Sequence, residues 1–531
     1  MTDDMMQPLG AQISAMLKDR GVEVIFGIPG VHNQELYRGI EQAGLTHVLA
    51  RHEQGAGFMA DGYARATGRP GVAYVITGPG LCNIMTPMGQ AYSDDVPVLV
   101  ISSCLADVTG RKGQLHQMID QRAAAATVCD WSEEARDAAT AYRQIDRALG
   151  AFAAGARRPK HLQVTIPALE ASARLAPPAP KASGPMPPDP VAVADVAARV
   201  TAARKPLLIL GGGAAGLGAD RAARLLRAGG FASFTTYAGR GIVPPGMPLH
   251  FGSYLARPDS ARMIAAADLV LVIGSELAEV DLWRDHAGHH APMIRVDHSQ
   301  DRLGQDVGAA VNVRSDAIRF VDALLAELAG REAAKDWKPE EVAQARAKWR
   351  AEVDAGFPGV LGVAEALRAA LPEDAMIYSD MTQFAYAAKE VWDMPRPGHW
   401  HHPYGFGTLG YALPAAIGGA VGRPGLPTLA IAGDYGFQYT LPELGVAVEL
   451  GLPLPILLWD NGKLGAIEDS MVGAQIAPKA VVARNPDFLA LARAYGAAAV
   501  APGNLAELCE AVNAAFAAKG PTLIRMTPDL A

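Results

Sequence analysis

A strand, a helix and a second strand near the C-terminus constrain this chain more than any other feature. Residues 428–434 form an apolar run that ends at Asp434, and residues 454–461 form another that ends at Asn461. Between them, residues 440–443 (Thr-Leu-Pro-Glu) have the spacing of a capping box with a proline in the first turn, which predicts a helix start. Parallel crossovers of this kind are right-handed in nearly all proteins, so we expect both strands to end at one sheet edge, where α/β proteins bind ligands.

The polar groups at the ends of these two strands are suited to a metal. Asp434 offers a carboxylate oxygen and Asn461 an amide oxygen. Mg²⁺ prefers such hard ligands and usually takes one or two of them together with substrate phosphates and water. The unit therefore predicts a site for a metal and a diphosphate. The alternative is a pair of ordinary strand-end turns, in which Gly-Asp and Asp-Asn-Gly are common.

Length and charge limit the kinds of protein that this chain can be. A chain of 531 residues is too long for one core and predicts about three domains. The net charge of −8 and the lack of a Lys/Arg run argue against a nucleic-acid partner. No apolar run reaches the ~18 residues of a membrane span, and the N-terminal residues lack a signal-peptide pattern. The four cysteines lack metal-ligand spacing, which favours reduced thiols in a cytoplasmic protein.

The order of strand and helix patterns predicts an α/β fold with three doubly wound parallel sheets. Apolar strands alternate with helical patterns over residues 1–172, and a proline-rich linker follows at about 176–190. A second α/β unit covers residues 191–330, and the third, which contains the metal motif, covers residues 358–531. The charged residues 331–354 predict a solvated connecting helix.

Four segments in order give the chain a family resemblance. The pair Gly433-Asp434, followed a helix and a strand later by Asn461, resembles the thiamine diphosphate (ThDP) motif, which is Gly-Asp-Gly followed by Asn-Asn. Residues 51–65 resemble the glutamate segment of such enzymes, residues 77–83 their glycine turn, and residues 405–418 the segment that contacts the aminopyrimidine ring. Together these segments make the chain resemble the acetolactate synthase and 2-oxo acid decarboxylase family over nearly its whole length.

The resemblance implies an architecture and an assembly. It implies two ThDP-binding domains of shared fold, one for the pyrimidine and one for the diphosphate and Mg²⁺, on either side of a Rossmann-like central domain. It also implies that the active site lies where domain one of one chain meets domain three of another. The expected partners are therefore a small 2-oxo acid and a second copy of the chain, in a homodimer or a homotetramer.

The resemblance also assigns roles to individual residues. Glu53 matches the catalytic glutamate that hydrogen-bonds the cofactor pyrimidine, and a carboxyl in an apolar cleft can carry a proton near neutral pH. As an alternative, Glu53 is simply an acid at a helix start. His116 is the second catalytic candidate, with a satisfied surface or core histidine as its alternative. The cofactor-binding candidates are Gly78, Asn83, Thr382, Gln383, Gly407, Leu409, Gly433 and Tyr435. The metal candidates are Asp434, Asn461 and the backbone oxygen of Lys463.

The chain departs from the family motif at two places, and its central unit lacks parts of a nucleotide-binding pattern. Tyr435 stands where the family has a small residue, so its side chain has to point away from the diphosphate. Asp460 replaces the first Asn and adds negative charge. The glycines Gly211, Gly213 and Gly216 fit a dinucleotide fingerprint, but no acid follows near residue 235. The Arg-Phe-Asp-Asp-like run of FAD-binding acetolactate synthases is also missing, which argues against FAD.

Residues near the expected cleft predict the substrate. The segment around His116 is closer to the Leu-His-His of simple decarboxylases than to the Phe-Gln-Glu of acetolactate synthases. Glu468 and Asp469 follow the metal motif and form a pair that can bind a guanidinium, or they are the acids of a solvated first helical turn. His32 and Gln117 are further candidates for substrate contact.

Three functions follow from these observations. The first is ThDP- and Mg²⁺-dependent decarboxylation of a 2-oxo acid, and the segments around residues 27–38 and 51–59 most resemble 5-guanidino-2-oxopentanoate decarboxylases. The second is carboligation of pyruvate by an acetolactate synthase-like transferase. The third is a non-catalytic nucleotide-binding subunit, because Tyr435 departs from the motif.

Overall fold

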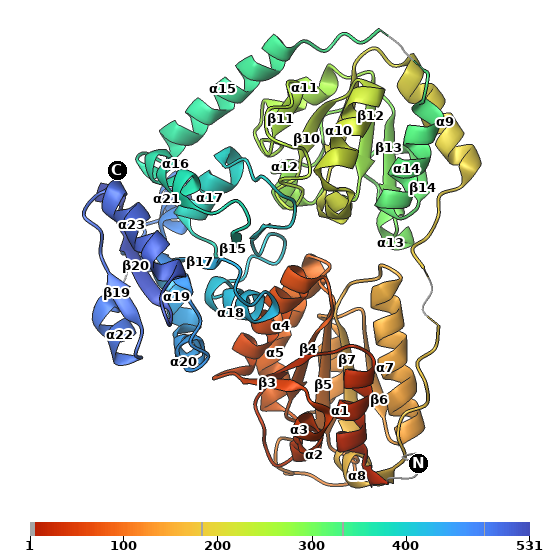
Figure 1. Ribbon diagram of the computed structural model, residues 1–531, viewed down its shortest axis with the longest axis vertical. Coiled ribbons are helices and arrows are strands. Elements are labelled where there is room, and N and C mark those ends of the chain that lie inside the picture. Colours follow the sequence, from red (N-terminus) through yellow and green to blue (C-terminus); the bar gives the residue numbers. More distant parts are fainter. Residues whose placement is uncertain (1–5, 182–183, 332–333, 483, 531) are drawn as a thin grey trace.

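Three six-stranded parallel sheets form the cores of the computed structural model (Figure 1), which describes residues 6–181, 184–331, 334–482 and 484–530. The N-terminal sheet contains β2 (Val24–Gly27), β3 (Thr46–Leu49), β4 (Gly71–Val75), β5 (Val98–Cys104), β6 (Trp131–Ala135) and β7 (Lys160–Thr165). The central sheet contains β9 (Pro206–Leu210), β10 (Ala232–Thr235), β11 (His250–Gly252), β12 (Leu269–Ile273), β13 (Met293–Asp297) and β14 (Ala309–Arg314). The C-terminal sheet contains β15 (Met376–Ser379), β16 (Trp400–His401), β17 (Thr428–Gly433), β18 (Pro455–Trp459), β19 (Ala498–Val500) and β20 (Thr522–Met526).

Helices cover both faces of each sheet. The N-terminal unit has α1 (Leu9–Asp19), α2 (Gln34–Arg38), α3 (Ile40–Ala43), α4 (Glu53–Thr67), α5 (Pro79–Ser93), α6 (Gln121–Ala126), α7 (Ala138–Ala153) and α8 (Ile166–Glu170), and a small pair of strands, β1 (Gln7–Pro8) and β8 (Ser172–Ala173). The central unit has α9 (Pro190–Ala202), η1 (Gly212–Leu217), α10 (Gly218–Gly229), α11 (Ser260–Ala265), α12 (Glu279–Leu282), α13 (Gln300–Leu303) and α14 (Ala317–Leu328). The connecting helix is α15 (Pro339–Gly356). The C-terminal unit has α16 (Val360–Ala370), α17 (Gln383–Val391), α18 (Ala412–Gly422), α19 (Asp434–Tyr439), η2 (Leu441–Glu443), α20 (Leu444–Glu449), α21 (Gly465–Gly473), α22 (Phe488–Ala494), α23 (Leu505–Phe516) and η3 (Pro528–Leu530).

The strand orders relate the first and third units to each other. The N-terminal sheet has the order β3-β2-β4-β5-β7-β6, and the C-terminal sheet has β16-β15-β17-β18-β20-β19. If the strands of each sheet are numbered in the order in which they occur in the chain, both sheets have the strand order 2-1-3-4-6-5. The central sheet has the order β11-β10-β9-β12-β13-β14, which is the Rossmann order 3-2-1-4-5-6. The expected α/β class with three doubly wound parallel sheets is therefore confirmed.

Local sequence accounts for these elements. The strands β4, β5, β9 and β12 are buried along their whole length, as continuous apolar runs in two-sided parallel sheets must be. Aspartates begin several helices: Asp137 accepts a 2.8 Å hydrogen bond from the backbone N–H of Thr140 at the start of α7. Within the described part of the chain, no helix combines the length and the apolar character needed to cross a membrane.

The helix α15 differs from the expected solvated connector. Its sequence is strongly charged, yet one face is buried and carries Val342, Ala345, Trp349 and Val353. Trp349 is fully buried, and its ring lies 5.8 Å from that of Phe251 and 5.6 Å from that of Tyr254. The sequence argument missed this face because four widely spaced apolar residues are outnumbered by charges. The helix therefore packs onto the central unit as well as crossing to the third (Figure 1).

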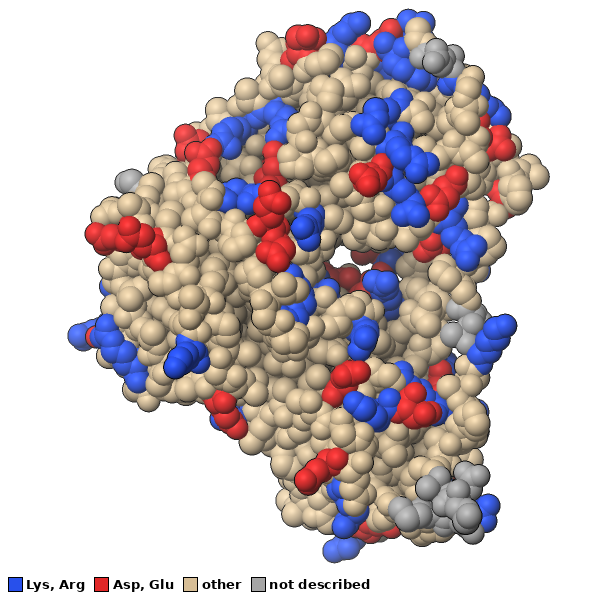
Figure 2. Space-filling view, viewed as in Figure 1, with Lys and Arg blue, Asp and Glu red and all other residues tan. Residues whose placement is uncertain are grey.

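The first and second units also touch through charged groups. Arg302 at α13 pairs with Asp95, which follows α5, and its Nε lies 3.4 Å from a carboxylate oxygen of Glu276. Figure 2 shows a hollow between these units with charged side chains inside it. On the face that it displays, positive and negative side chains are intermingled.

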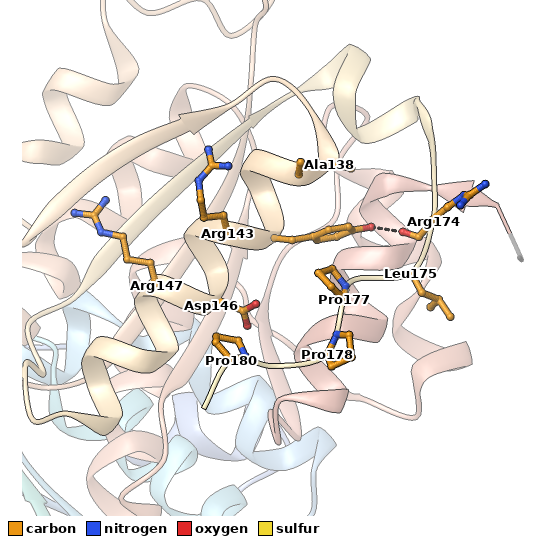
Figure 3. A pocket seen from close by; sticks show the side chains of 11 residues that line it. Ala138, Arg143, Asp146, Arg147, Arg174, Leu175, Pro177, Pro178 and Pro180 are labelled. Carbon is orange, nitrogen blue, oxygen red and sulfur yellow. Dashed lines mark hydrogen bonds between the residues drawn. The ribbon is translucent and has the colours of Figure 1, made fainter. Parts of the chain in front are cut away.

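The segment that leaves the N-terminal unit lies along α7 (Figure 3). The hydroxyl of Tyr142 donates a 2.6 Å hydrogen bond to the carbonyl of Arg174, and Nη2 of Arg20 donates one of the same length to the carbonyl of Pro177. A mostly apolar cavity of about 670 Å³ lies between α7 and the prolines of the linker. The predicted linker is thus extended but attached to the unit that it leaves.

The predicted capping box at residues 440–443 is wrong. The hydroxyl of Thr440 donates to the carbonyl of Gly410 at 2.8 Å instead of capping the helix. The carboxylate of Glu443 accepts hydrogen bonds from the backbone N–H groups of Arg51 (3.1 Å) and His52 (2.9 Å), at the start of α4. Tertiary contacts therefore recruit both side chains, and Glu443 joins the third unit to the first.

The helices α4 and α18 form the main contact between these two units. A Cβ at Gly62 would lie 1.9 Å from the carbonyl oxygen of Ala415, and one at Gly418 would lie 1.9 Å from that of Met59. These distances leave no room for any side chain at the two glycines. The rings of Phe58 and Tyr411 pack edge to face beside this crossing.

The buried Glu443 predicts a pH dependence of stability. Burial raises its pKa to about 7, and the backbone N–H groups of Arg51 and His52 offset only part of that rise. The folded chain therefore binds more protons at this site than the unfolded chain between about pH 4.5 and 7. Relative to a Glu443→Gln variant, the free energy of unfolding of the native chain should fall by about 3 kcal/mol as the pH rises through this window.

Urea denaturation of both proteins across this pH range measures the effect. Taking the difference between the two proteins cancels the titration of all other groups. A difference that stays constant from pH 4.5 to 7 would contradict the assignment.

Candidate active site

The N-terminal half of the site lies where the strand order of the first sheet reverses. The segment after β2 leads to His32, and the turn after β4 contains Gly78. Ligands of open α/β sheets bind at such switch points. Glu53 is the first residue of α4 and is buried, and Nδ2 of Asn83 donates a 2.9 Å hydrogen bond to its Oε2. The ring of His52 caps α4, so Glu53 does not serve as the cap.

Two histidines of the first unit face each other. The ring centroids of His32 and His116 are 4.9 Å apart at an interplanar angle of 68°. Both Nδ1 atoms are buried, without a hydrogen-bond partner among the described residues. Burial lowers the pKa of His32, and His116 lowers it further, so His32 is neutral at physiological pH. A neutral imidazole with an unpaired nitrogen can accept or donate a proton.

The backbone conformation at Gly78 allows the segment with His116 to lie against the turn after β4. Gly78 has φ +72°, and a Cβ there would lie 2.4 Å from the carbonyl oxygen of His116. His116 itself has φ +61°, a left-handed conformation that is uncommon for a residue other than glycine. Such strain concentrates at functional sites. The N–H of Gly78 donates a 2.9 Å hydrogen bond to Oε1 of Gln121, a residue that the sequence reasoning did not select.

The side chain of Gln117 forms hydrogen bonds within its own loop. Its Nε2 donates 2.9 Å hydrogen bonds to the carbonyls of Val108 and Arg111, and its Oε1 accepts one from the backbone of Gln114. The side chain thus holds together the loop that carries His116.

The C-terminal half of the site lies at the ends of β17 and β18. These strands pair in parallel, with Gly433 beside Trp459, so Asp434 and Asn461 follow neighbouring strand ends. Oδ2 of Asp434 accepts hydrogen bonds from the N–H of Gly462 at 2.9 Å and from Nδ2 of Asn485 at 2.6 Å. Burial raises the pKa of Asp434, and the nearby charge of Asp460 raises it further.

The amide of Asn461 is oriented by the helix that follows β15. Its Nδ2 donates a 2.8 Å hydrogen bond to Oε1 of Gln383, while its Oδ1 accepts a 3.3 Å bond from the N–H of Lys463. Thr382 is the residue before α17, and a Cβ at Gly433 would lie 3.2 Å from it. The starts of α17 and α19 therefore meet at this edge, and helix N-termini favour anions.

Both departures from the family motif are accommodated locally. The hydroxyl of Tyr435 lies 3.4 Å from the carbonyl of Val481, so this side chain reaches toward the segment after α21. Oδ2 of Asp460 accepts a 2.7 Å hydrogen bond from Nε of Arg525, and its Oδ1 accepts one from Asn485 at 2.9 Å. The guanidinium group of Arg525 therefore offsets the negative charge of the Asp460 carboxylate.

Asn485 was not predicted. It bridges Asp434 and Asp460, but it lies in a loop with no motif around it, so no sequence signal pointed to it.

The segment before α18 borders the same edge. Gly407 has φ +67°, and a Cβ there would lie 3.8 Å from the end of the Met381 side chain. Leu409 is half-buried two residues later. The N–H of Gly410 donates a 2.8 Å hydrogen bond to Asp380, which directly precedes the 381–383 turn. Asp380 was also overlooked, although it directly follows residues 375–379, a largely apolar run that is typical of a buried strand.

The predicted substrate acids lie on α21 beside the metal motif. The carboxylate of Glu468 pairs with Nζ of Lys463, and the side chain of Asp469 is exposed. Within the described residues no group of three or more His, Cys, Asp or Glu side chains could hold a metal. A magnesium site of two protein oxygens completed by phosphates and water does not need one.

The two halves of the site lie on different units of the chain. In the described ranges, no hydrogen bond or ion pair joins Glu53 or His116 to Asp434, Asn461 or Lys463. Exposed apolar side chains flank each half. In the first unit these are Val31, Leu115 and Ile119, and in the third they are Ile467, Val472 and Ile476.

The glycines that follow β9 in the central unit allow two strand-end turns to pack closely against each other. The N–H groups of Gly211 and Gly213 donate to the carbonyls of Ile273 (2.9 Å) and Gly274 (3.0 Å) at the end of β12. A Cβ at Gly211 would lie 2.2 Å from the carbonyl oxygen of Gly274. These amide groups are therefore used within the protein.

Family models of thiamine pyrophosphate enzymes match three parts of the chain. The N-terminal TPP-binding domain of thiamine pyrophosphate enzymes matches residues 8–124, the central domain matches residues 193–324, and the C-terminal TPP-binding domain matches residues 380–526.

The relatives include both expected enzyme types. The chain is 43% identical to a probable 2-ketoarginine decarboxylase of Pseudomonas aeruginosa, over 97% of this chain and 93% of that protein. It is 27% identical to the large subunit of acetolactate synthase isozyme 1 of Escherichia coli, over 97% and 92% of the two chains. It is 30% identical to the acetolactate synthase of Mycobacterium avium, over 96% and 86%. The chain belongs to the thiamine pyrophosphate enzyme family.

Proposed function

We propose that the protein is a ThDP- and Mg²⁺-dependent decarboxylase that acts on 5-guanidino-2-oxopentanoate (2-ketoarginine) without oxidation. The observation that carries the proposal is the His32–His116 pair, which lies in the same unit as Glu53 and whose two Nδ1 atoms are buried and have no hydrogen-bond partner among the described residues. A decarboxylase needs groups that move a proton at the reacting carbon, and two imidazoles supply them. The relation to a probable 2-ketoarginine decarboxylase over nearly the full chain supports the substrate.

The residues of the C-terminal half fit the metal and the diphosphate. Burial and the charge of Asp460 both raise the pKa of Asp434, so a bound divalent cation would stabilise its carboxylate. Within the described part of the chain, Oδ1 of Asn461 accepts a single long hydrogen bond, so it is available to a cation. We assign Mg²⁺ to Asp434, Asn461 and the carbonyl of Lys463, and the diphosphate to the starts of α17 and α19.

The residues of the N-terminal half fit the ring portion of the cofactor. When bound, thiamine diphosphate would supply a nucleophilic ring carbon and an electron sink for the electron pair that remains on the reacting carbon when CO₂ leaves. Glu53, oriented by Asn83, would hold a proton at the pyrimidine nitrogen. His32 and His116 would bind the substrate carboxylate or deliver the proton that replaces it. The amide groups of Gly211 and Gly213 are already bonded, which supports a reaction without FAD.

A second copy of the chain would complete the site. Each half is flanked by exposed apolar side chains, and such patches favour association. The first unit of one chain would then supply Glu53 and the histidines to the metal motif of the other.

Carboligation of pyruvate is the second candidate, because acetolactate synthases are related to the chain over its whole length. CO₂ release and product mass across pyruvate, branched-chain 2-oxo acids and 5-guanidino-2-oxopentanoate distinguish the two. An aldehyde one carbon shorter than the guanidino acid is expected. Acetolactate from pyruvate would overturn the proposal in favour of a synthase.

Glu53→Gln should lower the turnover number by about 10² or more while leaving ThDP affinity within a few-fold, because only proton transfer is lost. Steady-state kinetics and calorimetric titration with ThDP measure the two quantities. Glu41→Gln, an exposed change in the same unit, is the matched control and should behave like the native chain. Full turnover in the Glu53 variant would refute its catalytic role.

The double variant Glu468→Ala/Asp469→Ala should raise KM for 5-guanidino-2-oxopentanoate about tenfold, because a carboxylate pairs with guanidinium. The KM for an uncharged 2-oxo acid should stay unchanged. Equal increases in KM for the charged and the uncharged substrate would show that these acids do not bind the guanidinium group of the substrate.

Mixing two inactive variants tests whether the site is shared. Glu53→Gln and Asp434→Ala should each be inactive alone. If two chains build each site, random reassociation should restore about a quarter of native activity, because half of the dimers carry one intact site. Complete inactivity of the mixture, with mixed dimers demonstrated by mass spectrometry, would place each site within one chain.

A further inference from the structure

A polar cavity of about 560 Å³ lies in the N-terminal unit, and the proposed reaction does not use it. Its floor is formed by the carboxyl ends of β5, β7 and β6, and its roof is formed by residues 105–109 and 118–122. The carboxyl ends of parallel strands are where α/β sheets bind ligands. The volume is within the range of small-molecule sites.

Gln163 on β7 is the central polar group of this cavity. It is only 4% exposed, and its Nε2 donates a 2.6 Å hydrogen bond to a carboxylate oxygen of Glu134. Its Oε1 is buried and has no hydrogen-bond partner in the described part of the chain. An unpaired buried acceptor is unfavourable, and a donor in the cavity would satisfy it.

The charges around Gln163 favour a cationic donor. The lining carries the carboxylates of Asp107, Asp120, Glu133 and Glu134 against the guanidinium groups of Arg122 and Arg136. The backbone N–H groups of Gly110 and Thr109 lower the pKa of Asp107, so this carboxylate is ionised.

The two arginines that line the cavity differ in the ion pairs that they form. Nε of Arg136 already donates to Glu134 at 2.6 Å. Arg122 is exposed and makes no ion pair with another described residue, so it is available to an anionic group.

We propose that this cavity binds a small molecule with a guanidinium or primary ammonium group at one end and a carboxylate at the other. The cation donates to Oε1 of Gln163 and pairs with Glu134. The carboxylate pairs with Arg122.

The cavity wall is connected to the candidate active site. Gln121 lines the cavity and also accepts the hydrogen bond from the N–H of Gly78. His116 lies in the same segment, between residues 105–109 and 118–122, and its ring contacts that of His32. A ligand that joins this roof to β7 therefore restrains the loop that holds His116, which makes the cavity an effector site.

Calorimetric titration of the full chain, loaded with ThDP and Mg²⁺, tests the proposal with four probes. L-arginine and L-lysine should bind once per chain, whereas L-citrulline, the neutral isostere of arginine, should show no saturable heat. Agmatine lacks the carboxylate and should bind more weakly than arginine. Hydrogen exchange of residues 105–122 should slow when arginine is added.

Variants locate the binding site. Gln163→Met and Glu134→Gln should each weaken arginine binding at least tenfold, and Glu170→Gln, an exposed acid of the same unit, should leave it unchanged. Circular dichroism checks folding, and the partly exposed Glu134 carries the test if the Gln163 variant misfolds.

Three results would overturn the proposal. One is the absence of saturable binding by arginine and lysine, and another is equal binding of citrulline. The third is arginine binding that survives Gln163→Met and Glu134→Gln but is lost in Glu468→Ala/Asp469→Ala, which would put the cation in the substrate channel.

Discussion

The close crossing of α4 and α18 is the contact on which the arrangement of the site depends. Gly62 and Gly418 each face a carbonyl of the opposite helix at a distance that no Cβ could tolerate. Because the two backbones meet directly, the first and third units are held in a fixed relation. Glu53 begins one of these helices, and the segment with Gly407 precedes the other, so this contact fixes the two half-sites of one chain relative to each other.

Charged groups at the same crossing add directional constraints. Nε of Arg65 donates to Asp61 at 2.7 Å, its Nη2 donates to Asp94 at 2.8 Å, and the hydroxyl of Tyr411 donates to Asp61 at 2.8 Å. Burial raises the pKa of Asp94 to about 6, and Arg65 offsets part of that rise. Removing one partner of such a buried pair costs more than the pair contributes, so the network fixes one arrangement of the two helices.

The sequence predicts what local patterns encode and misses what long-range contacts decide. The strands before Asp434 and Asn461 were predictable because buried parallel strands are continuous apolar runs. The partner of Glu443 lies nearly four hundred residues away, so its capping-box spacing misled the local interpretation. The bridge from Asn485 to Asp434 likewise depends on how a loop folds back. The glycines after β9 fitted a nucleotide fingerprint, yet a neighbouring turn explains them.

The shared strand order of the outer sheets gives a physical reason for a divided site. Each sheet reverses its order between its first and third strands, and each reversal carries site residues: Gly78 and His32 in one, Asp434 and Thr382 in the other. In the proposed site, each of the two crevices would hold one end of the cofactor. At the switch point of the central sheet, the N–H groups of Gly211 and Gly213 bond to the turn after β12.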